Sequence, residues 1–230
     1  MAAKKAVLFD MDGVLYDSMP RHEKAWQESM ARYGIHMTAL DAYLTEGQRG
    51  VDTIRQMVLQ QQGRHISEEE AQKMYNLKSE TFHSKGDAPL MPGIMDLMER
   101  ITQSGLTIGV VTGSAQRPLI ARLTSDFGTY LTEERIVTAY DVKRGKPLPD
   151  PYLMGLQKVG NLKPEEAIVV ENAPLGVQAA VAAGIFTIAV NTGPLPDQLL
   201  LEKGANRLYH RMTDLRDDWP SLIEELSAIC

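Results

Sequence analysis

The chain has 230 residues, of which 43% are hydrophobic and 23% are charged, and its formal net charge is −6 at pH 7. This length suits one main domain with a smaller insertion, and the composition is that of an ordinary globular protein. A nucleic-acid-binding protein would normally carry a basic stripe, which this acidic balance does not favour. The only cysteine, Cys230, leaves no partner for an intrachain disulfide and indicates a reducing compartment.

No apolar stretch approaches the ~20 residues that cross a bilayer, and too few apolar residues follow the N-terminus for a signal peptide. We therefore expect a cytoplasmic protein without membrane or nucleic-acid partners, and we expect it to be a monomer.

Short apolar runs predict the strands, and helical patterns follow several of them. Continuous β-branched runs that alternate with helices indicate an α/β fold, a Rossmann-like parallel sheet with helices on both faces. Ligands bind such sheets beyond the carboxyl ends of the strands, where Asp10, Thr112 and Glu171 would converge. The predicted strands are 6–9, 106–111, 167–170 and 185–190, and the predicted helices of this part include 117–126 and 174–183.

The pattern changes between the first strand and residue 90. Helical periodicity covers 20–33 and 67–84, residues 51–62 are also compatible with a helix, and no convincing strand lies among them. We predict an all-helical cap domain at 17–87, inserted into a core domain that comprises 1–16 and 88–230. An insertion that joins the core beside the ligand-binding edge is well placed to act as a lid.

Two carboxylates, Asp10 and Asp12, end the first predicted strand. An ionised Asp10 can attack phosphorus and form an aspartyl-phosphate, while Asp12, held protonated, can donate to the leaving oxygen. Residues i and i+2 of an extended segment share one side, so both can face one phosphate. A local turn or cap is the alternative for these residues, and Gly13 with Val14 breaks the pattern of a calcium-binding loop.

A phosphate site also needs cations and hydrogen-bond donors. Lys146 lies in a loop stiffened by prolines and is a candidate cation, although an ordinary surface lysine is the alternative. Thr112 ends a predicted buried strand, so its hydroxyl and the amides of Gly113 and Ser114 can bind phosphate oxygens. The same three residues are also compatible with a helix N-cap.

Four segments together resemble the ordered motifs of the haloacid dehalogenase (HAD) superfamily, and most closely its β-phosphoglucomutase-like branch of phosphatases, pyrophosphatases and phosphohexomutases. They are DMDGV (10–14), VVTGS (110–114), GKPLPDPY (145–152) and VVENAPLG (169–176). The resemblance implies Asp10 as nucleophile, Asp12 as acid and base, Thr112 as phosphate ligand and Lys146 as charge-neutralising partner. It also implies Mg²⁺, held by the Asp10 carboxylate, the Asp12 backbone carbonyl and the fourth motif at Glu171 and Asn172.

Two departures from the family pattern bear on the substrate. Asn172 stands where a second acid is usual, and it can bind the metal through its amide oxygen, cap the following helix, or do both. In the loop 44–52, Glu46 stands where the mutase has a lysine, with Arg49 shifted by one position. We hypothesise that Glu46 approaches the metal when the cap closes, although it can instead point to solvent. A carboxylate placed there favours a compact substrate such as pyrophosphate, with Arg49 near the distal phosphate.

Two further polar residues of the cap are candidates for substrate contact. His22 and Trp26 share one face of the first inserted helix. The mutase uses a histidine at this place for sugar recognition, but we expect His22 to face solvent and Trp26 to pack in the core. Lys78 can point into the cleft from another inserted helix, although we expect by default that it lies on a solvent-exposed helix face.

The sequence thus predicts a Mg²⁺-dependent phosphohydrolase that acts through an aspartyl-phosphate on a small phosphorylated compound, with pyrophosphate favoured and a sugar phosphate possible. A phosphohexomutase is the alternative. A non-catalytic phosphate- or metal-binding module is a third hypothesis, which the intact set of Asp10, Asp12, Thr112 and Lys146 disfavours.

Overall fold

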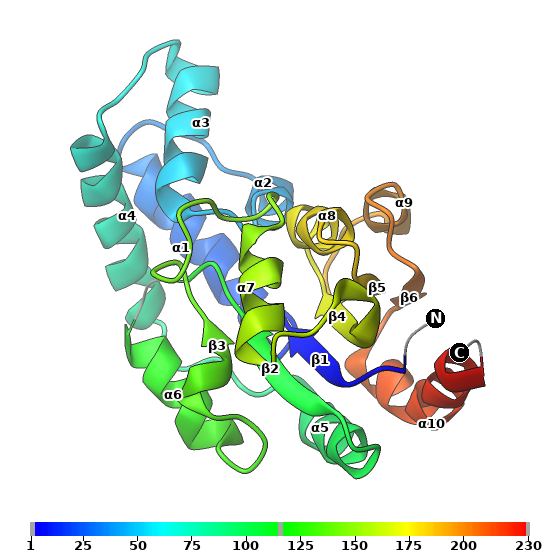
Figure 1. Cartoon of the computed structure of the whole chain (residues 1–230). Coiled ribbons are helices and arrows are strands. Elements are labelled where there is room, and N and C mark those ends of the chain that lie inside the picture. Colours follow the sequence, from blue (N-terminus) through cyan, green and yellow to red (C-terminus); the bar gives the residue numbers. More distant parts are fainter. Residues whose placement is uncertain (1–2, 115–116, 229–230) are drawn as a thin grey trace.

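The core of the protein is a single parallel sheet. The computed structural model describes residues 3–114 and 117–228. Within these ranges six strands pair in the order β3-β2-β1-β4-β5-β6 (Figure 1). The strand order reverses at β1, which pairs in parallel with both β2 and β4, and such a switch point is where parallel sheets bind ligands. The strands are β1 (Ala6–Phe9), β2 (Thr107–Val111), β3 (Ile136–Val137), β4 (Ala167–Glu171), β5 (Phe186–Val190) and β6 (Arg207–Tyr209).

Helices cover both faces of this sheet. They are α5 (Ile94–Gln103), α6 (Arg117–Phe127), α7 (Asp150–Lys158), α8 (Pro174–Ala182), α9 (Asp197–Leu201) and α10 (Met212–Ala228), with the short 3-10 helices η1 (Glu133–Arg135) and η2 (Pro164–Glu166). Successive residues of β1 point to opposite faces. Val7 and Phe9 belong to the apolar cluster that includes α5 and α10, whereas Ala6 and Leu8 belong to the cluster that includes α7 and α8. Burial on both faces explains why the strands are continuous apolar runs.

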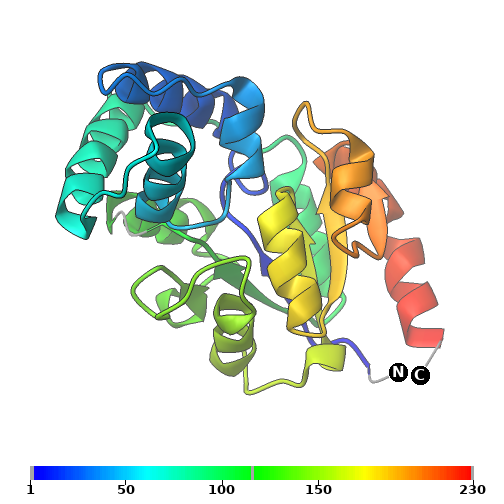
Figure 2. The same cartoon turned by 90° about the horizontal axis from the view of Figure 1, so that it is seen from above.

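A second group of helices lies to one side of the sheet, between β1 and β2 in the chain (Figure 2). It consists of α1 (Met19–Ala31), α2 (Ala39–Leu44), α3 (Gly50–Gln62) and α4 (Glu68–His83). The Ser67 hydroxyl caps α4 by accepting a hydrogen bond from an amide of its first turn at 3.1 Å. These helices share an apolar cluster of their own that contains Trp26, Met30 and Ile54, so they pack as a separate layer.

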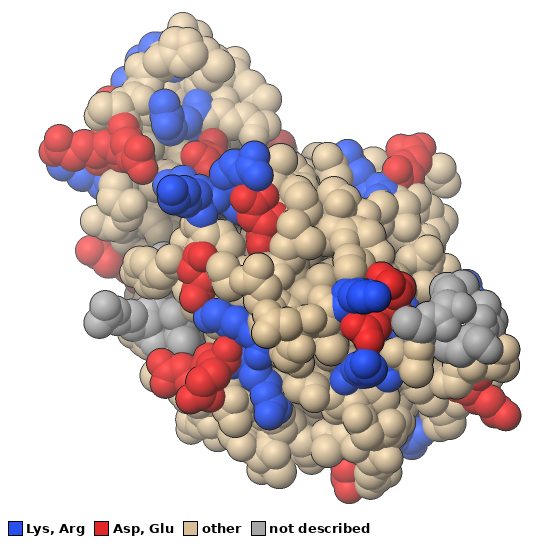
Figure 3. All heavy atoms as spheres, viewed as in Figure 1, with Lys and Arg blue, Asp and Glu red and all other residues tan. Residues whose placement is uncertain are grey.

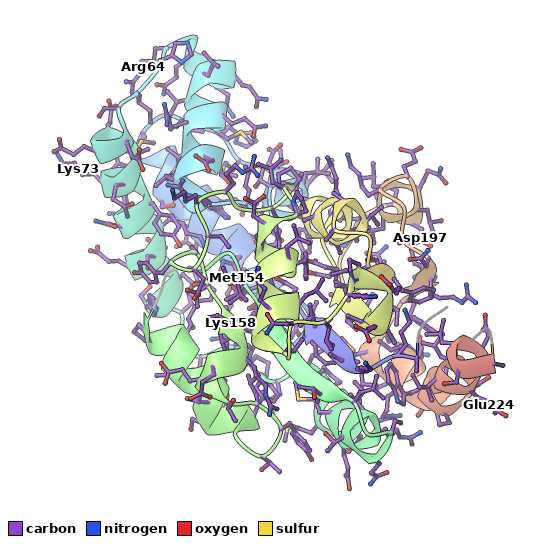
Figure 4. The ribbon with its side chains drawn as sticks, in the orientation of Figure 1. Arg64, Lys73, Met154, Lys158, Asp197 and Glu224 are labelled. Atoms are coloured by element: carbon purple, nitrogen blue, oxygen red, sulfur yellow. The ribbon has the colours of Figure 1, made fainter. Side chains whose placement is uncertain are left out.

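Two adjacent segments connect the inserted helices to the core. The Met91 amide donates to the Leu15 carbonyl at 2.8 Å, and the Asp17 amide donates to the Pro89 carbonyl at 2.9 Å. Both connections therefore leave the core side by side. Figure 4 shows Arg64 at the far end of the inserted helices, remote from the sheet.

The predicted α/β class is confirmed, and the four predicted strands occur within one residue of their expected ends. The sequence analysis missed β3 and β6, which have two and three residues and are too short to show a periodicity. It also missed α2, which a capping box at Thr38 and Asp41 starts. In the part of the chain that the structure describes, no helix has the length and apolar character to span a membrane.

Candidate active site

The carboxyl ends of β1, β2 and β4 bring together a buried cluster around Asp10. The Lys146 ammonium donates to Asp10 Oδ1 at 2.6 Å, to Glu171 Oε1 at 2.7 Å and to the Val111 carbonyl at 3.0 Å. The sequence analysis anticipated Lys146 as a cation of the site, and the structure brings it into direct contact with Asp10. The alternative of a surface lysine is wrong, because its side chain is 1% exposed.

Burial governs the charges of this cluster. It raises the pKa of Asp10 well above its ordinary value, and the nearby Glu171 carboxylate raises it further against the opposing effect of Lys146. Burial alone would lower the pKa of Lys146, but Asp10 and Glu171 outweigh it, so this pKa lies above its ordinary value. The ammonium therefore stays charged and balances two carboxylates that would otherwise repel each other.

Glu171 has no oxygen left for a metal ion. Its Oε1 accepts from Lys146 and, at 2.7 Å, from the Tyr152 hydroxyl, while its Oε2 accepts from the amides of Asn172 at 3.0 Å and Ala173 at 3.2 Å. The sequence analysis named Glu171 as a metal ligand, and these four donors argue against that assignment. Tyr152 lies within the motif GKPLPDPY (145–152), but the sequence analysis assigned no role to it.

The Asn172 side chain fits the metal role better than Glu171. Its Oδ1 is buried and has no hydrogen-bond partner among the described residues, which is costly unless a ligand completes it. The alternative that Asn172 caps α8 is wrong, because α8 begins after Ala173 without a side-chain cap. Among the described residues no group of three or more His, Cys, Asp and Glu side chains forms a ligand set. A site built from the Asp10 carboxylate, the Asp12 carbonyl and the Asn172 amide oxygen is consistent with that finding, because two of its ligands are not side-chain carboxylates.

Asp12 lies in a different environment, made by residues of the insertion. Its Oδ1 accepts from the Ser18 hydroxyl at 2.6 Å and contacts His22 Nε2 at 3.0 Å. His22 Nδ1 in turn lies 2.7 Å from Lys78 Nζ. An ammonium can only donate, so Nδ1 accepts and Nε2–H donates to Asp12. The chain Asp12–His22–Lys78 thus connects β1 to α1 and α4.

The partners of Asp12 correct one expectation. Burial raises its pKa, but the contact with His22, followed by the hydrogen bond from Ser18 and the charge of Lys78, outweighs burial. The pKa of Asp12 lies below its ordinary value while that of Asp10 lies above it. The sequence analysis expected an ionised Asp10 and a protonated Asp12, because the donors around Asp12 could not be seen in the sequence. A bound divalent cation would favour the ionised form of Asp10.

His22 and Lys78 also correct the expectation that both side chains face solvent. They are 5% and 3% exposed. The His22 ring stacks on Phe82 with 4.1 Å between centroids, and Lys78 Nζ lies 4.8 Å from the centroid of Trp26. Burial lowers the pKa of Lys78 to about 8, although Glu46 and Asp12 oppose this shift. Trp26 packs in the apolar cluster of the insertion, as expected.

The loop after β2 meets the loop between α2 and α3. Thr112 Oγ1 accepts from the Ser114 amide at 3.0 Å, so this amide has a partner within its own turn. A Cβ atom on Gly113 would lie 2.8 Å from the carbonyl oxygen of Gly47, and one on Gly47 would lie 3.2 Å from Lys146 Cδ. The backbones of the two loops are therefore in contact, and the inserted helices are closed over the site.

A cavity of about 40 Å³ remains between the two parts, and we name it the inner chamber. Glu46 lines it beside Asp12, His22, Lys78 and Thr112. Burial raises the pKa of Glu46, and the nearby Asp12 carboxylate also raises it, while His22 and Lys78 act in the opposite direction. Glu46 thus faces the chamber, and the alternative that it points to solvent is wrong.

Arg49 does not line the inner chamber. Its guanidinium lies 3.3 Å from a Glu68 oxygen and 3.8 Å from an Asp52 oxygen. Arg49 lines a small cavity together with Thr112, Gly113 and Lys146, and its place near a distal phosphate stays a prediction. On the face drawn in Figure 3, basic and acidic residues are interspersed, and neither sign forms an extended patch.

Comparisons with known proteins show the family to which the chain is similar. The family model for haloacid dehalogenase-like hydrolases matches residues 4–184. Hexitol phosphatase A of Escherichia coli is 36% identical over 187 residues, which are 81% of this chain and 83% of that protein. A solved structure described as a putative beta-phosphoglucomutase from Bacteroides vulgatus is 48% identical, with a TM-score of 0.92 over 97% of this chain and 90% of that one.

The chain therefore belongs to the haloacid dehalogenase-like hydrolase family, and the resemblance found in its four motifs is confirmed. Another relative is the fructose-1-phosphate phosphatase YqaB of Escherichia coli, which is 28% identical over 80% of this chain and 95% of its own length.

Proposed function

We propose that the protein is a Mg²⁺-dependent phosphohydrolase of small phosphorylated compounds and that inorganic pyrophosphate is its favoured substrate. The observation that carries the proposal is the pair Asp10 and Asp12 at the switch point of the sheet, in separate environments, with Asp12 lining the inner chamber. Relatives described as phosphatases of sugar phosphates support the reaction class.

The chain's own residues supply each step of the reaction. An Asp10 carboxylate oxygen attacks phosphorus, and the bond from phosphorus to the leaving oxygen breaks. The leaving phosphate of pyrophosphate departs as an anion and needs no proton from Asp12, whose pKa below its ordinary value keeps it ionised. Asp12 then accepts a proton from water as the water attacks the aspartyl-phosphate, which releases phosphate and restores Asp10. The Thr112 hydroxyl donates to a phosphoryl oxygen. Lys146, whose three hydrogens go to Asp10, Glu171 and the Val111 carbonyl, stabilises the phosphoryl group through its positive charge.

Mg²⁺ would be held by the Asp10 carboxylate, the Asp12 carbonyl and the Asn172 amide oxygen. When bound, it neutralises charge on the phosphoryl group. We retain the hypothesis that Glu46 supplies the negative charge that Asn172 lacks, because Glu46 lines the inner chamber with Asp12.

The size of the inner chamber favours pyrophosphate over a sugar phosphate. One water needs roughly 10–15 Å³ by the same measure, so about 40 Å³ holds only a compact group. A hexose beside the phosphoryl group would need the inserted helices to move apart.

A phosphohexomutase is the second candidate, which the match to the structure described as a putative beta-phosphoglucomutase favours. The two functions differ in the fate of the phosphoryl group. Phosphate release with Mg²⁺ should be measured from pyrophosphate, β-glucose 1-phosphate, glucose 6-phosphate and p-nitrophenyl phosphate. The β-glucose 1-phosphate sample should also be followed for glucose 6-phosphate.

We expect the highest kcat/KM with pyrophosphate. Isomerisation without phosphate release would instead establish a mutase, and binding without either reaction would establish a non-catalytic module. The role of Glu46 is tested by Glu46→Gln, which should raise the Mg²⁺ concentration needed for half-maximal activity. Glu69→Gln is the matched control, because Glu69 lies on the exposed side of α4. An unchanged Mg²⁺ requirement in Glu46→Gln would remove the metal role.

A further inference from the structure

A second, larger cavity lies outside the inner chamber. It has a volume of about 610 Å³ and opens between α3 and α4 on one side and the loop after β3 on the other. We name it the outer cleft. Its volume falls within the range of about 300–1,000 Å³ that is usual for small-molecule sites. Its lining includes Arg49, Gln72, Asn76, Ser79 and Tyr140.

Three residues line both cavities and so form the wall between them: Gly50, Tyr75 and Gly113. Only Tyr75 brings a side chain to this wall. A Cβ atom on Gly50 would lie 2.2 Å from Cε2 and 2.3 Å from Cδ2 of the Tyr75 ring. The ring therefore lies directly against the backbone at the start of α3, in the space that a side chain at position 50 would fill.

The spacing of residues on α4 explains this arrangement. Lys78 is three residues after Tyr75 and faces the inner chamber. Gln72, Asn76 and Ser79 recur at helical spacing and face the outer cleft. Tyr75 stands at the border between the two stripes, so one helix lines both cavities and carries the ring that divides them.

We propose that Tyr75 is a specificity-determining residue, whose ring closes the inner chamber and excludes leaving groups larger than a phosphate. This inference rests on the proposed function and names the structural reason for its substrate class. A phosphoric anhydride is compact enough to react behind the ring. A hexose or hexitol phosphate needs its carbon chain to extend into the outer cleft, through the space that the ring occupies.

The ring can be removed, kept or displaced by three substitutions. Tyr75→Ala joins the two cavities. Tyr75→Phe keeps the ring. Gly50→Ala displaces the ring without changing it, and it is compatible with the backbone because Gly50 is a helical residue outside the positive-φ glycines. Gln72→Ala is the control, because Gln72 lines the outer cleft alone.

The quantity to measure is the ratio of kcat/KM for glucose 6-phosphate to kcat/KM for pyrophosphate. We expect Tyr75→Ala to raise this ratio by about tenfold or more, since pocket shape commonly contributes discrimination of about 10–200-fold. Gly50→Ala should raise it less, and Tyr75→Phe and Gln72→Ala should leave it within about twofold of the parent. A ratio that is unchanged in both Tyr75→Ala and Gly50→Ala would overturn the inference. If Tyr75→Ala does not fold, Gly50→Ala decides alone.

A binding measurement separates this inference from the proposed function. Calorimetry of the same two compounds with Asp10→Asn, with and without Tyr75→Ala, gives the ratio of their Kd values in the absence of turnover. A tenfold shift of that ratio toward glucose 6-phosphate supports the role of Tyr75 even if the parent protein hydrolyses neither compound, an outcome that would contradict the proposed function alone. An unmoved ratio of Kd values with normal hydrolysis of pyrophosphate contradicts the role of Tyr75 alone.

Discussion

Asp10 and Asp12 are separated by one residue, yet their partners come from different parts of the molecule. Asp10 is bound by Lys146, which Glu171 also holds, and all three lie at the edge of the sheet. Asp12 is bound by Ser18 and His22, which lie at the start of the insertion. The cluster around Asp10 is therefore complete within the core, whereas the cluster around Asp12 requires the inserted helices to lie over the sheet. Loss of the Lys146 cation on the first side should affect both folding and catalysis, whereas substitutions on the second side should mainly affect catalysis.

The largest effect on turnover is expected from Asp10→Asn, which keeps the shape of the side chain and removes the proposed nucleophile. Phosphate release should fall at least about 10⁴-fold, because loss of a nucleophile removes the covalent route. Lys146 keeps its bond to Glu171, so the thermal midpoint should stay close to that of the parent. Residual activity above one hundredth of the parent would show that Asp10 is not the nucleophile.

Lys146→Met should break the cluster around Asp10 as a whole. It leaves two buried carboxylates without their cation, and removal of one partner of a buried ion pair typically costs about 3–5 kcal/mol. Urea unfolding should show a loss of this size, accompanied by loss of phosphate release. Lys143→Met is the control, because Lys143 is exposed and its replacement should change the free energy of unfolding by less than about 0.5 kcal/mol. Equal stability of the two variants would contradict the comparison.

Lys78→Met tests the cluster around Asp12. The change keeps the length of the side chain and its contacts with aromatic rings, but it removes the donor to His22. Turnover should fall about 100-fold, the scale of a misplaced acid–base group, while urea unfolding at pH 7 should show no loss of stability. A loss of stability as large as that of Lys146→Met would remove the distinction between the two sides.

The same lysine predicts how stability depends on pH. Burial lowers the pKa of Lys78 to about 8, from 10.5 as the ordinary value. Between these two values the unfolded chain binds the proton more tightly, so the contribution of Lys78 makes the free energy of unfolding rise with pH in this window. Below about pH 8 the group is protonated in both states and its unfavourable contribution is complete. Urea unfolding at pH 7.5 and pH 9.5 should show a larger rise in the parent than in Lys78→Met.

The smallest effect is expected from Tyr152→Phe, which removes one of the four donors to Glu171. A hydrogen bond to a charged group contributes about 1.5–3 kcal/mol, and the three remaining donors should keep the loss at the lower end. Turnover should fall by less than about tenfold. If turnover fell as far as in Lys146→Met, Tyr152 would have a direct part in the reaction.

The core-side residues could be predicted from the sequence because they follow directly from the ends of strands. Asp10, Thr112 and Glu171 each lie at the carboxyl end of an apolar run, and parallel strands align these ends at one edge. The different surroundings of Glu171 and Asn172 could not be predicted in this way. They depend on how many donors contact Glu171, and one of these donors is the hydroxyl of Tyr152 on α7.

The surroundings of His22 and Lys78 could not be predicted. A helical pattern shows which residues share a face, but not which element packs against that face. His22 and Lys78 are polar and occur on amphipathic helices, so a solvated face was the expected outcome. Their burial follows from the closure of α1 and α4 over Asp12, a contact between segments 56 residues apart. The partner of Arg49 could not be predicted for a similar reason, because Glu68 lies 19 residues further along the chain, at the start of α4.

The contact between Gly113 and the Gly47 carbonyl has a consequence for how such a protein can diversify. This contact joins main chain to main chain, and a carbonyl oxygen is present whatever side chain a residue carries. Glu46 and Arg49 can therefore be replaced by other residue types while the main-chain contact between the loops is retained. On the proposed function, the side chains of this loop act on the substrate while its main chain maintains closure, so the side chains can vary without loss of closure.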